Sequence, residues 1–207
     1  MITRDFQTAA KRDIYRILSS LVIPRPIAWV TTVDAEGRVN LAPFSSFMGI
    51  FGPPMVAMSL SRRRGGALKD THRNLLERGE AVVHLADLPL LEPLHASAEE
   101  VAPEVSELGR LGLATAPSDL VAPPRLEAAP VALECRFNRE VELGPGTTLL
   151  LLDVLRAHAA ERIYDETLDC ADASTWQPVA RLGAVAGPNY GALGATFRLG
   201  ASELPKD

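Results

Sequence analysis

The chain has 207 residues, a length typical of one domain, and its 47% hydrophobic and 23% charged residues are ordinary for a folded protein. A formal net charge of −5 argues against a nucleic-acid binder, so any basic patch must be local. No signal peptide is visible, no apolar stretch reaches the roughly 20 residues of a membrane span, and the two cysteines lack metal-site spacing. We therefore expect one cytoplasmic domain over residues 1–207, with its core at about 15–199 and with no metal, membrane or nucleic-acid partner.

The first part of the chain predicts a short helix and three strands. Apolar residues at helical spacing begin a helix at about Asp13. Alternation and β-branched residues then predict strands over 27–33, 39–47 and 55–60. The acidic segment 34–37 ends in glycine and suits a hairpin loop between the first two strands.

The best predicted helix covers residues 67–78, where leucines share one face. Asp70 or Thr71 can cap its start, and Gly79 stands just past its end, where helices often need a positive φ.

The second half predicts a strand, short helices and a long hairpin. The strands cover 81–86, 131–143 and 147–159, with a late strand at 192–199. Residues 88–111 are predicted as short helices broken by proline, and 113–130 as a loop crossover. Ser97 with Glu100 fits a capping box, and Gly109 can end a last helical turn. Six or seven strands, mostly in hairpins, favour an antiparallel barrel or sandwich.

Hydroxyls and cations lie on either side of the third strand and at the start of the best helix. Phosphate groups bind N–H and O–H donors, positive charge and helix N-termini. The residues of this kind are Ser45, Ser46, Ser61, Arg62, Lys69 and Thr71. A phosphate-bearing ligand is one interpretation, and a solvated basic loop beside an ordinarily capped helix is the other.

The second candidate segment runs from residue 40 to residue 46, together with Arg25 and Pro26. Pro43 prevents a complete ladder of backbone hydrogen bonds, which leaves neighbouring groups free for a planar heterocycle such as a flavin. An edge strand blunted by proline explains the same pattern.

The other reactive side chains are scattered. We expect His72 to be exposed on its helix and His84 to pack within a strand, and a ligand role for His158 stays open. Cys135 is expected in the core and Cys170 at the surface. Alternation along 131–143 places Glu134 on a solvated face.

Several motifs resemble the flavin reductase-like, FMN-binding split-barrel family, and the flavoredoxin-type branch in particular. The matching segments are Arg25-Pro26-Ile27-Ala28-Trp29-Val30-Thr31-Thr32, Gly37-Arg38-Val39-Asn40-Leu41-Ala42-Pro43-Phe44-Ser45, Pro53-Pro54, Lys69-Asp70-Thr71, Gly112-Leu113, Pro130-Val131-Ala132-Leu133-Glu134-Cys135 and Arg181-Leu182-Gly183. They span roughly residues 15–197. The tail departs from the family pattern, because Ala184 replaces a second glycine and five residues precede Tyr190, so a contact between Tyr190 and a flavin stays open.

The resemblance implies an all-β dominated fold, a six-stranded antiparallel Greek-key split barrel with a few peripheral helices. It implies a homodimer with FMN, or alternatively FAD, bound near the interface. The positions it assigns to the cofactor are Arg25, Leu41, Ala42, Pro43, Phe44, Ser45, Ser46, Ser61, Arg62, Lys69, Asp70 and Thr71. Which arginine of 62–64 meets the phosphate stays open.

The implied activity is that of an NAD(P)H:flavin oxidoreductase, such as the reductase component of a two-component monooxygenase with an oxygenase partner. One alternative is an FMN electron carrier of the flavoredoxin type that makes no direct use of NAD(P)H. The other is a non-catalytic ligand-binding barrel. No catalytic residue is assigned.

Overall fold

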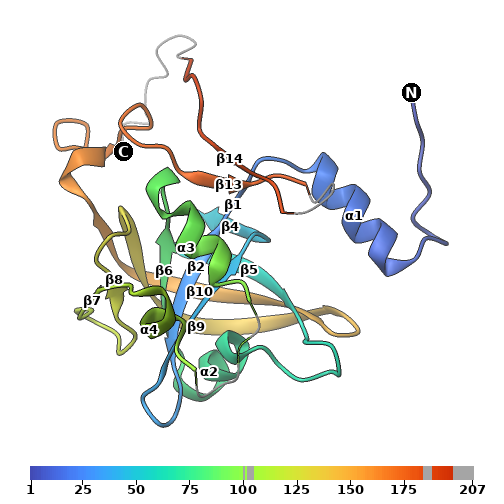
Figure 1. Cartoon of the computed structure of the whole chain (residues 1–207), viewed down its shortest axis with the longest axis horizontal. Coiled ribbons are helices and arrows are strands. Elements are labelled where there is room, and N and C mark those ends of the chain that lie inside the picture. Colours follow the sequence, from blue (N-terminus) through green and yellow to red (C-terminus); the bar gives the residue numbers. More distant parts are fainter. Residues whose placement is uncertain (100, 102–104, 184–187, 198–207) are drawn as a thin grey trace.

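The structure, a computed structural model, describes residues 1–99, 101, 105–183 and 188–197. Most of the secondary structure is β, with a few helices around the main sheet (Figure 1). This confirms the expected class. None of the helices in the described part of the chain is both long and apolar enough to cross a membrane.

The main sheet has seven strands, all paired antiparallel. In spatial order they are β3 (Val39–Phe44), β2 (Ala28–Val33), β6 (Glu80–Leu85), β9 (Val131–Gly144), β10 (Thr147–Ala159), β5 (Met55–Ser61) and β4 (Phe47–Ile50). The sequence predicted one strand over 39–47, but the chain bends at Ser45 and Ser46 and continues as a separate strand.

This bend shows that the sheet is strongly curled. β3 and β4 stand at opposite ends of the strand order, yet only Ser45 and Ser46 separate them along the chain. Seven flat strands would place these edges roughly 29 Å apart, whereas three Cα steps reach at most roughly 11 Å. β3 also contacts β5. The described residues show no ladder between β3 and β4, so the curl is not closed by hydrogen bonds, and the sheet has seven strands where six were expected.

The curled sheet encloses one apolar core, and a second lies beneath the helices on its outer side. The inner core includes Val30, Met58, Leu75 and Leu150, all fully or almost fully buried. The second gathers residues of β2, β3 and the helices that cover them, and its members include Trp29, Leu41, Leu94, Leu108 and Leu126. Trp29 Nε1 donates to Ser97 Oγ at 2.9 Å, so the largest side chain of this core also satisfies its polar atom.

α2 (Asp70–Arg78) begins three residues later than predicted. Lys69 is its N-cap and makes no capping hydrogen bond through its side chain, so the prediction that Asp70 or Thr71 caps the helix is wrong. Gly79 ends it at φ +72°, as expected, because this left-handed conformation costs glycine little.

The other helices lie around the sheet, except for α1 (Figure 1). They are α1 (Lys11–Leu21), η1 (Leu88–Leu90), α3 (Leu91–Ala96), α4 (Glu107–Leu111) and η2 (Glu161–Ile163). α1 stands apart from the main sheet at one end of the molecule. Ser97 is the C-cap of α3 rather than an N-cap, while Glu100 lies outside the described residues. α4 ends at Gly112, not at Gly109.

Three small sheets complete the fold. β1 (Arg25–Pro26), β13 (Val179–Arg181) and β14 (Tyr190–Ala192) pair above the main sheet in Figure 1. β7 (Thr115–Ala116) pairs with β8 (Arg125–Leu126) inside the segment predicted as a loop, and β11 (Tyr164–Asp165) pairs with β12 (Cys170–Ala171). The predicted strand at 192–199 is wrong for 193–197, which are not strand, and residues 198–199 lie outside the described residues.

Two predictions of exposure are wrong. His72 is buried, and its Nε2 lies 2.7 Å from Glu140 Oε2 on β9, which the sequence pattern of α2 alone does not reveal. Glu134 is also fully buried, because the segment before β8 covers the outer face of β9. His84 and Cys135 are buried and Cys170 is exposed, as expected.

Candidate functional site: a groove along the edge strand

Three contiguous cavities follow β3 and the Ser45–Ser46 bend. The first, of about 160 Å³, is lined by β3 and the start of α2. The second, also about 160 Å³, shares Pro43 and Ala98 with the first. The third, of about 380 Å³, shares Tyr15 and Ser45 with the second. Together they form one groove beside the edge strand.

Most of the predicted cofactor positions line this groove. Ala42, Pro43, Phe44, Lys69, Asp70 and Thr71 line the first cavity. Pro43 and Ser45 line the second, and Arg25, Ser45 and Ser46 line the third. The structure therefore brings together two segments that are about 25 residues apart in the sequence.

The first cavity ends at the uncapped start of α2. The first N–H groups of a helix have no partner within the helix, and the Lys69 side chain does not cap them. Lys69 Nζ lies 5.7 Å from the centre of the Phe44 ring. Thr71 Oγ1 accepts a hydrogen bond from Asn40 Nδ2 at 2.9 Å, which leaves the hydroxyl proton of Thr71 available to a ligand. These groups form a donor-rich corner suited to an oxyanion.

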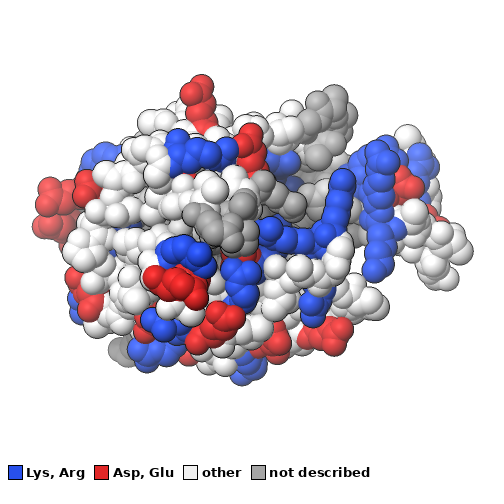
Figure 2. Space-filling view, turned by 60° about the horizontal axis from the view of Figure 1, so that its bottom comes forward, with Lys and Arg blue, Asp and Glu red and all other residues white. Residues whose placement is uncertain are grey.

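Two cations and three carboxylates line this cavity: Arg63 and Lys69, with Asp70, Glu99 and Glu107. Asp70 forms ion pairs with Arg63 and Arg73, so its carboxylate is neutralised and the Arg63 guanidinium is fixed at the cavity wall. Glu99 also lines the cavity, and the hydrogen bond from Arg110 lowers the pKa of Glu99. Figure 2 shows Lys and Arg side chains from the middle of this face to the end that carries α1, with acidic ones among them. With Arg73 and Arg110, which pair with Asp70 and Glu99, this corner has four cations to three carboxylates, in a chain whose net charge is negative.

The far end of the groove contains a buried cationic atom without a partner. Arg25 Nε is inaccessible to solvent and makes no hydrogen bond. An unsatisfied buried donor of a charged group costs more than about 1–3 kcal/mol, so an acceptor is expected there. The groove thus offers donors at both ends, and its residues fit an elongated ligand that carries a phosphate at one end.

Three predicted positions do not line the groove. Leu41 is buried in the second core, and its N–H donates to Glu107 Oε2 at 3.1 Å. Ser61 and Arg62 are exposed at the end of β5, where Arg62 Nη1 donates to Gly66 O at 3.0 Å. Roles for these three in cofactor binding stay predictions, and of the basic loop it is Arg63 that lines the first cavity.

The sequence did not predict that Arg181 lines the second cavity, and it left open whether Tyr190 contacts a ligand. The Arg181 guanidinium carbon lies 4.9 Å from the centre of the Tyr190 ring, and Tyr190 Oη is 3.0 Å from His95 Nδ1. Both Arg181 and Tyr190 line that cavity together with Pro43 and Ser45. The Arg181-Leu182-Gly183 motif was the signal in the sequence, but only the pairing of β13 with β1 and β14 shows its location.

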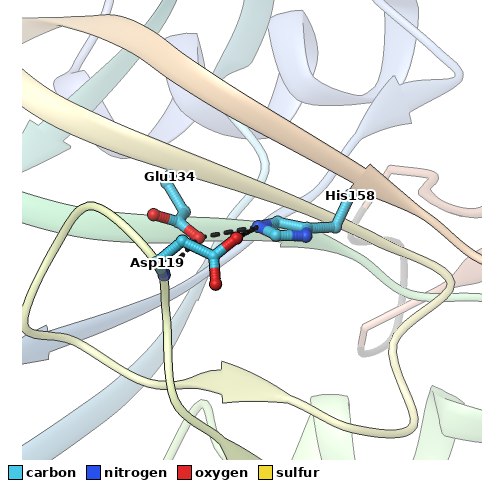
Figure 3. A group of neighbouring side chains, drawn as sticks. All are labelled: Asp119, Glu134 and His158. Carbon is cyan, nitrogen blue, oxygen red and sulfur yellow. Dashed lines mark hydrogen bonds and ion pairs between the residues drawn. The ribbon is translucent and has the colours of Figure 1, made fainter.

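A second polar cluster, away from the groove, consists of Asp119, Glu134 and His158 (Figure 3). Glu134 accepts the N–H groups of Asp119 and Leu120 at 2.9 and 2.6 Å, and His158 Nε2 lies 2.7 Å from it. Burial alone would raise the pKa of Glu134, but these hydrogen bonds outweigh it and hold the pKa below its usual value. Both carboxylate oxygens are thus occupied by the loop that they anchor to β9, which indicates a structural role.

Comparisons with known sequences and structures show to which family the chain belongs. The Flavin reductase like domain model matches residues 19–174. The uncharacterized protein YwrF of Bacillus subtilis is 38% identical over 199 residues, 93% of this chain and 95% of that protein. The crystal structure of nitrilotriacetate monooxygenase component B from Bacillus cereus superposes with a TM-score of 0.89 at 34% identity, covering 96% of this chain and 98% of that one. The 2-nitrobenzoate 2-nitroreductase NbaA of Pseudomonas fluorescens gives a TM-score of 0.86 at 27% identity, covering 99% of each chain. The chain therefore belongs to the family with the flavin reductase like domain.

Proposed function

We propose that this chain binds FMN along the β3 groove and acts as an NAD(P)H:flavin oxidoreductase. The observation that carries the proposal is an uncapped helix start, bordered by Lys69 and Arg63, at one end of a groove along β3 in a chain of this family. The 34% identity to nitrilotriacetate monooxygenase component B supports the reductase half of a two-component monooxygenase as the physiological setting.

The start of α2 would hold the phosphate. The first-turn N–H groups, Lys69 and Arg63 supply donors and positive charge, and the Thr71 hydroxyl adds a further donor. Each charge-assisted hydrogen bond contributes about 1.5–3 kcal/mol. Arg62 and Ser61, at the rim of the same loop, would contribute after a change of side-chain rotamer, and their exposure leaves them free to do so.

The backbone of β3 would hold the rest of the cofactor. β3 pairs only with β2, so in the described structure one edge of the strand between Leu41 and Ser45 carries no ladder. Pro43 has no N–H of its own and the Leu41 N–H donates to Glu107 Oε2, so this edge would offer a ligand mainly backbone carbonyl groups. When bound, the flavin supplies the hydride-accepting chemistry. The chain has to fix its position and leave one face open to the nicotinamide, and no side chain has to act as a general base.

A homodimer belongs to the same proposal. α1 exposes Leu18 and Leu21, and Val22 and Ile23 directly after it are exposed as well. An apolar cavity of about 630 Å³ lies beside them, between β1, β13 and β14. A second copy of the chain would cover this apolar surface. A partner oxygenase and a cytoplasmic location stay predictions with it.

The first experiment is the absorbance spectrum of the purified protein after addition of FMN or FAD, followed by titration with NADH and NADPH without oxygen. Flavin bands that bleach on addition of either nucleotide support the reductase. Bands that persist until a chemical reductant is added favour the electron carrier, and a colourless protein that ignores both flavins supports a non-redox binding module.

The matched variants are Lys69→Ala with Thr71→Ala, and Lys11→Ala as a control on exposed α1. We expect the double variant to weaken FMN binding at least tenfold, because both side chains border the cavity, and to lower the melting temperature moderately, because Thr71 is buried and accepts from Asn40 Nδ2. Unchanged flavin affinity with a lower melting temperature would contradict the phosphate assignment.

A further inference from the structure

Two arginines face each other across the small upper sheet. Arg25 of β1 is the direct partner of Arg181 of β13 in an antiparallel pair. Directly opposed residues in such a pair project to the same face, with Cβ atoms about 4.5–5.5 Å apart. Like charges at this spacing repel and destabilise the pair unless an anion lies between or beside them.

No carboxylate of the described chain neutralises this pair. The Arg25 side chain makes no ion pair, and its Nε is buried without an acceptor. Arg181 has only the face of Tyr190 beneath its guanidinium, at 4.9 Å. Of the other cations of the groove, Arg63 is paired with Asp70, and Lys69 borders the proposed phosphate site. An unmatched pair of guanidinium groups that line two adjoining cavities therefore indicates a site for an external oxyanion.

The location of the pair decides which molecule carries the oxyanion. Arg25 lines the third cavity and Arg181 the second, and these cavities share Tyr15 and Ser45. The proposed phosphate site is in the first cavity, beyond Pro43. An FMN bound as proposed has its phosphate in the first cavity, at the end of the groove opposite Arg25. The oxyanion at the arginines therefore belongs to a second molecule.

We propose that Arg25 and Arg181 together bind an oxyanion of the molecule that exchanges electrons with the flavin, with the diphosphate of a nicotinamide dinucleotide as its source. This rests on the proposed function. The apolar members of the second cavity, Ile27 and Leu94, suit an organic molecule rather than a small hydrated ion. Tyr190, whose hydroxyl lies 3.0 Å from His95 Nδ1, holds Arg181 in place from below.

The test compares Arg181→Gln, Arg181→Lys and, as a control, Arg139→Gln on the exposed part of β9, in the flavin-loaded protein. We expect Arg181→Gln to raise the KM for NADH at least tenfold, while kcat and the FMN dissociation constant change less than threefold. Arg181→Lys retains the charge and recovers part of the loss, and Arg139→Gln behaves as the wild type.

A binding assay without turnover separates the possible sources. ADP and benzoate are titrated into the oxidised protein by calorimetry. ADP binding that weakens tenfold in Arg181→Gln supports the diphosphate, and benzoate binding with the same dependence supports the oxyanion pair with a carboxylate as its source. The proposal is overturned if ADP and benzoate bind Arg181→Gln as they bind the wild type and the KM for NADH is unchanged. It is equally overturned if Arg181→Gln weakens FMN but not riboflavin, because the flavin phosphate then lies here. A protein that binds no flavin refutes the proposed function instead.

Discussion

His84 gives the fold a built-in sensitivity to acid. The ring is fully buried between two strands, with Nδ1 2.8 Å from Trp29 O, and Nε2 accepts the N–H of Leu126 at 3.0 Å. This arrangement requires a neutral imidazole whose Nδ1 carries the proton, because a protonated Nε2 cannot accept. Desolvation lowers the pKa of His84 from 6.5 to about 4.

The sign and size of the effect follow from linkage. Between pH 6.5 and about 4 His84 is protonated in the unfolded chain but not in the folded chain. The free energy of unfolding therefore falls as the pH falls through this range, and the contribution of His84 is fully present only above about pH 6.5. At pH 4.5 the loss from this group is about 2.5 kcal/mol, from 1.36 kcal/mol per unit of pKa shift.

The assay is urea unfolding at pH 7.5 and 4.5 for the wild type, His84→Gln and Thr31→Val. Thr31 donates to Pro124 O at 2.8 Å from the same strand as Trp29, so Thr31→Val removes a buried hydrogen bond without changing a titrating group. We expect the unfolding free energy of His84→Gln to fall by about 2.5 kcal/mol less between the two pH values than in the wild type. The unfolding free energy of Thr31→Val should fall by as much as that of the wild type. Equal losses in all three proteins would refute a neutral, buried imidazole.

Three further predictions concern other parts of the fold. Burial raises the pKa of the Cys135 thiol to about 12, so a disulfide reagent at pH 8 should titrate only the exposed Cys170 quickly, and both thiols after addition of denaturant. Glu134→Gln replaces one accepting oxygen by a donor that faces a backbone N–H, and we expect a loss of about 2–4 kcal/mol in urea unfolding, whereas an unchanged midpoint would exclude the anchoring role. A Cβ at Gly183 would lie 2.7 Å from Ser20 Cα, so Gly183→Ala should make α1 more susceptible to limited proteolysis, with cleavage rates as the readout.

Most of the residues that the sequence predicted for the site lie together in the structure, and local patterns account for this. Pro43, the hydroxyls beside it and the cations before α2 are local features, and the structure gathers them in one groove because β3 and α2 border the same cavity. The choice between neighbouring arginines was not predictable, since it depends on the conformation of a loop that contains two glycines with positive φ, Gly65 and Gly66, and Arg63 rather than Arg62 lines the cavity.

Burial of polar residues was the weaker part of the prediction. Alternation along β9 correctly placed Glu134 on the face of the strand that points away from the inner core. This face is not solvated, however, because a segment about 15 residues earlier covers it. His72 is hidden for the same kind of reason, by Glu140 on a distant strand. Such covering depends on long-range packing, which periodicity within one element does not contain.

The strand count shows the same limit. Two-residue strands such as β1 and β7 carry no periodicity, and the pairing of β1 with β13 joins segments more than 150 residues apart. That pairing brings Arg181 to the groove. The sequence therefore showed the Arg181-Leu182-Gly183 motif, but it did not show where this motif lies in the fold.

The central claim, that the start of α2 binds the phosphate of a flavin, is tested most directly by calorimetric titration of the apoprotein with FMN and with riboflavin at low salt. Two charge-assisted bonds, from Lys69 and Arg63, contribute at least about 3 kcal/mol together, so FMN should bind at least about 100-fold more tightly than riboflavin. Equal affinities for the two flavins, or binding of neither, would contradict the account.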